Sequence, residues 1–75
     1  MNSYNKGRRW AWAVFNSAVS DYGELGIRKC DKASRTCNKI AQSGKKNGKR
    51  LLKSDLAFYK GAVVGFQEYY NKKIN

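Results

Sequence analysis

Cys30 and Cys37 are the side chains of this sequence best suited to metal binding, nucleophilic chemistry or a disulfide. A structural zinc site usually needs four Cys or His ligands, and the chain has two cysteines and no histidine. Nucleophilic cysteine chemistry normally also needs a histidine base. On one helix, residues seven apart are about 10.5 Å apart along the axis, whereas a disulfide needs Cα atoms within about 7 Å. We therefore interpret both cysteines as reduced packing residues, and an intermolecular or redox role stays open as the alternative.

The cations are the second group able to do chemistry. The chain carries sixteen Lys/Arg and five Asp/Glu residues, a net charge of +11, and this imbalance favours nucleic acid, acidic lipid or an acidic protein surface as partner. Ten of the sixteen lie between Arg28 and Lys53, where Asp31 is the only acid. The residues that we expect to contact nucleic acid are Arg28, Lys29, Lys32, Arg35, Lys39, Lys45, Lys46, Lys49 and Arg50, together with Arg8 and Arg9 near the start of the chain.

Catalytic patterns are missing from the sequence. The segment SGKKNGKR (43–50) contains glycines and lysines but lacks the GxxxxGK[ST] order of a phosphate-binding loop, and no strand is predicted before it. The acids are scattered, without a pair at helical spacing inside one predicted helix, and suit helix capping and local charge balance. We expect a binding protein rather than an enzyme, with no metal and no cofactor.

Periodicity predicts a first helix over residues 7–22. At 100° per residue its larger apolar side chains share one side of a helix, and Gly23 is suited to end it. We expect Ser3 or Asn5 to cap its start. The apolar side consists of Ala11, Val14, Phe15, Ala18, Val19 and Tyr22.

Trp10 and Trp12 lie on opposite borders of this apolar side, directly after Arg8 and Arg9. A tryptophan in this position either closes the hydrophobic core or presents an edge on which an unpaired base can stack. Both interpretations stay open for both residues, and the core is the more common outcome for a single tryptophan.

A second helix is predicted over residues 27–43, after a turn formed by residues 23–26. Small and apolar residues are spaced 3-4-3-4 along one narrow line of this helix, which ends at Gly44. They are Cys30, Ala33, Cys37, Ile40 and Gly44. The cations Arg28, Lys32, Arg35 and Lys39 run 4-3-4 and point within about 60° of each other, away from that line. The helix is therefore amphipathic, with a ridge of one charge sign.

Residues 43–53 contain an Asn-Gly pair, which favours a type I′ hairpin, but its flanks are lysines rather than strand-forming residues. We therefore expect a flexible basic loop, followed by a third helix over 54–72 with Ser54 as its N-cap. Gly61 and Gly65 form a GxxxG pair, which predicts close packing of a neighbouring helix. The predicted fold is a single all-α domain of three helices, with Phe15, Ile40, Val63 and Phe66 at its core.

RNA is favoured over DNA as the partner. A helix that reads duplex DNA places base-reading side chains in its exposed N-terminal half, and here that half offers mostly phosphate-type contacts. Lysine-rich loops and edge aromatics suit irregular or single-stranded RNA better. Two alternatives remain: an inhibitor that docks on an acidic protein surface, and a cationic membrane-active peptide like the leaderless bacteriocins. A homodimer is compatible with the sequence.

The chain resembles the small basic early proteins of tailed phages in three features: the RRWAW start, the basic block over 28–53 and the AFYKGAVVGF segment. Among them it is similar to the TifA type of anti-defence protein, which counters ToxIN-type toxin–antitoxin systems. The resemblance implies binding to RNA or to an RNA-bound host nuclease or toxin, and inhibition of that enzyme. With no export signal and no apolar run of about 18 residues, we expect a cytoplasmic, non-membrane protein, in the host cytoplasm if a phage encodes it.

Overall fold

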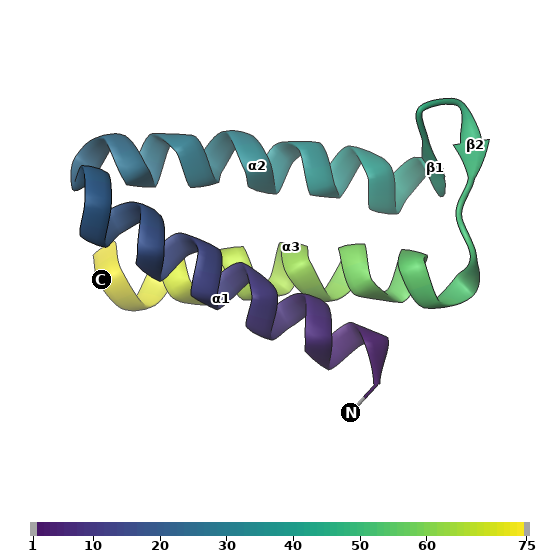
Figure 1. The fold of residues 1–75 in the computed structure, drawn as a ribbon, viewed down its shortest axis with the longest axis horizontal. Coiled ribbons are helices and arrows are strands. Elements are labelled where there is room, and N and C mark those ends of the chain that lie inside the picture. Colours follow the sequence, from purple (N-terminus) through teal and green to yellow (C-terminus); the bar gives the residue numbers. More distant parts are fainter. Residues whose placement is uncertain (1, 75) are drawn as a thin grey trace.

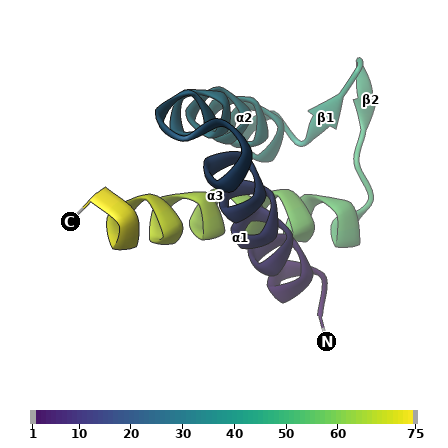
Figure 2. The same ribbon diagram turned by 60° about the vertical axis from the view of Figure 1, so that its left-hand side comes forward.

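The computed structural model describes residues 2–74, which form three helices and a short hairpin (Figure 1). The all-α three-helix prediction is confirmed. The elements are α1 (Ser3–Tyr22), α2 (Glu24–Ser43), β1 (Lys45–Lys46), β2 (Lys49–Arg50) and α3 (Lys53–Ile74). α1 and α3 run in the same direction and cross, while α2 runs back along them (Figures 1 and 2).

The helix ends differ from the predicted ones for local reasons. Asn2, rather than Ser3 or Asn5, caps α1, because its side-chain oxygen accepts the Asn5 backbone N–H at 2.8 Å. α3 starts one residue before Ser54, because the Leu52 carbonyl accepts the first helical N–H, that of Leu56, at 2.9 Å. Ser54 is therefore inside the helix and the predicted N-cap was wrong.

A single residue, Gly23, joins α1 to α2, so the predicted four-residue turn was too long. Its φ of +58° with ψ of −129° is a combination that favours glycine, and its N–H closes the end of α1 by donating to the Val19 carbonyl at 2.8 Å. Gly26 is buried in the first turn of α2, where a β-carbon would overlap the backbone of Ala18. The absence of a side chain at Gly26 thus allows α2 to fold back directly against the end of α1.

α1 and α3 meet through glycines on both helices. A β-carbon on Gly7 would overlap the Phe58 carbonyl, one on Gly61 would overlap the Tyr4 carbonyl, and one on Gly65 would overlap the Arg8 carbonyl. The two backbones are therefore in direct contact at the crossing, which confirms the prediction that the GxxxG pair packs closely against a neighbouring helix.

The core lies where all three helices face each other. Its buried residues are Ala11, Phe15, Cys30, Cys37, Ala62, Phe66 and Tyr69. The Phe15 ring lies 4.7 Å from that of Tyr69 and 6.3 Å from that of Phe66, so the centre of the core is aromatic. The buried Tyr69 hydroxyl donates to the Asn16 side-chain oxygen at 2.7 Å, which satisfies its polar group.

Phe15 and Phe66 were correctly predicted as core residues, and Val63 is partly buried against them. Ile40 was wrongly placed at the centre: it is only half-buried. It lies three residues before the end of α2, and at that end α1 has diverged from α2 (Figures 1 and 2). Periodicity identified its side of the helix but not how many helices cover that side.

Cys30 and Cys37 are both buried and unbridged, as the packing interpretation requires. Burial raises the pKa of each thiol, so both stay protonated and unreactive near neutral pH. They act as small apolar residues that bring α2 close to the aromatic core.

The close contact at the helix crossing predicts whether an alanine at position 61 raises or lowers the free energy of unfolding. On a free helix surface, Gly61→Ala would stabilise by about 0.5–1 kcal/mol, because alanine loses less backbone entropy. Here the new methyl group forces α1 away, and we expect a net loss of about 1–3 kcal/mol in the free energy of unfolding, measured by urea denaturation. An increase in stability would show that the helices do not approach as described.

Candidate nucleic-acid interface

The outer face of α2 carries a continuous ridge of cations. Arg28, Lys32, Arg35 and Lys39 are all exposed and extend over about 16 Å of helix. They lie opposite Cys30, whose side of the helix is buried, so their side chains are not needed for packing. This arrangement agrees with the predicted amphipathic helix.

Two of the cations on α2 have a partner within the protein. The Arg35 guanidinium pairs with the Asp31 carboxylate one turn earlier at 3.2 Å, with both side chains more than half exposed. The Lys29 ammonium lies 5.2 Å from the centre of the Tyr22 ring, beside the ridge. Exposed pairs of this kind contribute little to stability, so both cations remain available to a ligand.

The segment after α2 is a β-hairpin, and the prediction of a flexible loop was wrong. Lys45 pairs with Arg50 and Lys46 with Lys49, around a two-residue turn. Asn47 and Gly48 have φ of +53° and +77°, as a type I′ turn requires at both central positions. The turn preference of Asn-Gly therefore outweighs the weak strand propensity of the flanking lysines.

The hairpin is fixed to the helices at its base. The Leu51 N–H donates to the Gly44 carbonyl at 2.8 Å, and the Lys45 N–H donates to the Ser43 hydroxyl at 3.2 Å. The Lys46 ammonium donates to the Tyr59 hydroxyl of α3 at 2.9 Å. This hydrogen bond raises the pKa of Lys46. The hairpin thus projects from the end of α2 as an ordered element (Figure 2).

The ridge, the neighbouring Lys29 and the four cations of the hairpin follow one another along α2 and the hairpin, and we call these nine residues together the basic strip. Like charges stand directly opposite each other in both hairpin pairs, an arrangement that is unfavourable unless an anion offsets it. The strip contains nine of the eleven residues predicted to contact nucleic acid, all of them exposed. They are Arg28, Lys29, Lys32, Arg35, Lys39, Lys45, Lys46, Lys49 and Arg50.

Arg8 lies outside the strip and has a different partner. Its guanidinium donates two hydrogen bonds to the Glu68 carboxylate of α3. The bond from Nη2 to Oε2 has a length of 2.8 Å. The Trp12 indole N–H also points at this carboxylate, at 3.5 Å. The hydrogen bond from Arg8 lowers the pKa of Glu68 and raises that of Arg8 itself. Arg8 therefore ties α1 to α3, a role that only the tertiary structure reveals.

Arg9 lies on the edge of a hollow of about 460 Å³ between α1 and α3, again apart from the strip. Lys72 and Lys73 of α3 line the same hollow. The Lys72 ammonium lies 5.4 Å from the centre of the Trp12 ring, and the Lys73 ammonium 5.5 Å from that of Tyr69. Two cations are thus placed over aromatic rings rather than directed freely into solvent.

Both tryptophans pack at the α1–α3 contact and keep part of their surface open. Trp12 meets Tyr69 edge to face with ring centres 5.2 Å apart. Trp10 packs against Phe58 and Phe66 at 5.5 and 5.8 Å, yet is 41% exposed. Closing the core is therefore part of the role of each, and an edge remains accessible at Trp10.

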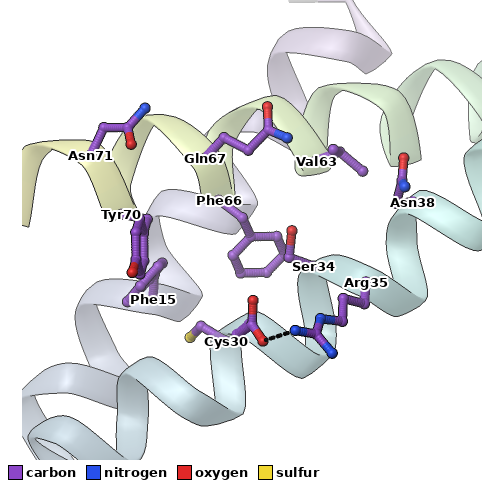
Figure 3. Close-up of a pocket in the computed structure, with 11 residues that line it drawn as sticks. Phe15, Cys30, Ser34, Arg35, Asn38, Val63, Phe66, Gln67, Tyr70 and Asn71 are labelled. Carbon is purple, nitrogen blue, oxygen red and sulfur yellow. Dashed lines mark ion pairs between the residues drawn. The ribbon is translucent and has the colours of Figure 1, made fainter. Parts of the chain in front are cut away.

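A groove of about 500 Å³ opens between α2 and α3, next to the strip (Figure 3). Apolar side chains line its depth: Phe15, Cys30, Val63 and Phe66. Its polar and aromatic lining is Asp31, Ser34, Arg35, Asn38, Gln67, Tyr70 and Asn71. Sequence reasoning missed this groove, because its two walls are far apart in the chain. The only indication in the sequence was that uncharged polar residues lie beside the line of small and apolar residues along α2.

No family model, no curated protein and no solved structure matches this chain. Within residues 2–74, no helix combines the length and the apolar character needed to cross a membrane.

The Arg8–Glu68 pair predicts a specific dependence of stability on pH. Because the pKa of Glu68 is lowered in the folded state, its contribution is present above the unfolded value of about 4.3 and is lost as the pH falls through the folded value. Glu68→Gln should therefore lower the melting temperature at pH 7 and reduce its further fall on acidification below about pH 4.3. Glu24→Gln, which removes an exposed carboxylate from α2, should keep the original acid dependence. Equal pH profiles for the parent and Glu68→Gln would contradict this role.

Proposed function

We propose that this protein binds RNA through the basic strip. The observation that carries the proposal is the alignment of nine exposed cations along α2 and the hairpin, with Asp31 as the one carboxylate among them. Cations in such a row neutralise successive phosphates and release the counterions condensed on the nucleic acid. A net charge of +11 on 75 residues also raises the rate of encounter with a polyanion.

Single-stranded or irregular RNA suits this strip better than duplex DNA. The exposed side chains on the N-terminal half of α2 are Glu24, Leu25, Arg28, Lys29, Asp31 and Lys32, and the cations among them suit phosphate contacts rather than base reading. The hairpin projects at an angle to the end of α2, so the strip is bent (Figure 1). A flexible single strand follows such a bend at a lower cost in free energy than a stiff duplex does.

The resemblance to phage anti-defence proteins of the TifA type extends this proposal to a biological setting. The RNA would then be one held by a host toxin nuclease, and binding of the strip would inhibit that enzyme. Direct docking of the strip on an acidic protein surface is the competing explanation of the same cations. Capture of partners from a host extract with and without ribonuclease treatment separates the two, because only docking on protein survives the treatment.

Removal of two ridge cations tests the strip itself. In Lys32→Ala with Lys39→Ala, neither residue is paired within the described chain, and neither lines the groove. This variant should bind a single-stranded RNA more weakly and flatten the slope of log K against log salt by about 0.7 per lost contact. Fluorescence anisotropy at several salt concentrations measures both effects, and circular dichroism should show unchanged helix content.

The matched control removes the same charge from another place. Lys72→Ala with Lys73→Ala alters the hollow between α1 and α3, and should weaken binding less than the ridge pair does. Equal losses from the two double variants would mean that attraction is diffuse and that the strip is not the binding site.

A further inference from the structure

The groove between α2 and α3 is directly connected to the basic strip through Arg35. This residue belongs to the outer ridge and also lines the groove (Figure 3). A nucleotide whose phosphate contacts the Arg35 guanidinium therefore has its base within reach of the groove. The volume of about 500 Å³ falls within the range of about 300–1,000 Å³ typical of small-ligand sites.

The groove offers both surfaces that an unpaired base requires. Phe66 and Val63 provide an apolar floor, and Tyr70 of α3, which is 43% exposed, provides an aromatic ring at the wall. Stacking on such a ring holds any base, because every base has a π-face. The side chains of Asn38 and Gln67 add hydrogen-bonding groups from both walls.

Asp31 is the unusual member of this lining. It is the only carboxylate in the stretch from Arg28 to Lys53, and a carboxylate repels the phosphates that the surrounding cations attract. An ionised carboxylate accepts hydrogen bonds and donates none, so it favours a ligand that presents N–H groups. The Arg35 guanidinium, 3.2 Å away, holds it at the edge of the groove.

Guanine is the base whose pairing edge matches this acceptor. Its N1–H and N2–H groups are adjacent donors that two carboxylate oxygens can accept together, whereas the pairing edges of adenine, cytosine and uracil each present a donor next to an acceptor. We propose that the groove between α2 and α3 binds an unpaired guanine of the RNA, with Tyr70 stacking on the base and Asp31 accepting from its pairing edge. This inference rests on the proposed RNA binding by the strip.

The test compares three heptamer RNAs, UUUUUUU, UUUAUUU and UUUGUUU, by fluorescence anisotropy. The native protein should bind the guanine-containing strand roughly fivefold or more tightly than the other two, the discrimination expected of one good two-bond contact. Equal affinity for the adenine and guanine strands would mean stacking without readout by Asp31, and would overturn the assignment of guanine.

Asp31→Asn supplies the decisive variant, since it adds one unit of positive net charge. It should bind UUUUUUU at least as tightly as the native protein does, yet lose its preference for UUUGUUU. Asp21→Asn makes the same charge change at an exposed site outside the groove and should keep the preference. If the preference for guanine persists in Asp31→Asn, the role of Asp31 is wrong.

The outcomes also separate this inference from the function on which it rests. Salt-dependent binding of all three strands with equal affinity leaves RNA binding by the strip intact and overturns the guanine site alone. Failure of all three strands to bind overturns both.

Discussion

The backbone contact between α1 and α3 is the constraint on which the rest of the structure depends. Gly7, Gly61 and Gly65 carry no side chains at the crossing, and each would overlap the opposite helix if it did. This closeness places Arg8 against Glu68 and packs the tryptophans of α1 against the edges and faces of the aromatic rings of α3. Two helices with few large aliphatic residues thereby form a stable aromatic contact.

The α1–α3 pair leaves α2 with a limited structural task. α2 needs only a narrow line of small residues, of which Cys30 and Cys37 are buried, to cover the core. Most of its circumference is free to carry charge, so the cations are concentrated where they disturb packing least. The same concentration creates local repulsion along α2 and the hairpin, which a bound polyanion would relieve. The α1–α3 contact thus supplies stability, while α2 and the hairpin supply the phosphate contacts of the proposed RNA binding.

Periodicity was sufficient to predict the three helices and the ridge of α2, because both depend on spacing within one element. Properties that depend on neighbouring elements were less accessible. The partner of Arg8, the partial burial of Ile40 and the meeting of Arg9 with Lys72 follow from how helices cross, which spacing does not reveal. The hairpin was different, because Asn47 and Gly48 already indicate a type I′ turn and the low strand propensity of the flanking lysines argued against it only weakly.

The central claim is that RNA contacts one defined surface of this protein rather than its charge as a whole. Nuclear magnetic resonance measures this directly, through changes in backbone amide shifts of the labelled protein on titration with a single-stranded RNA. We expect the largest changes over residues 28–39 of α2 and 45–50 of the hairpin, with small changes along the α1–α3 crossing. Changes centred on Arg9, Lys72 and Lys73, or spread evenly over all exposed cations, would contradict the account.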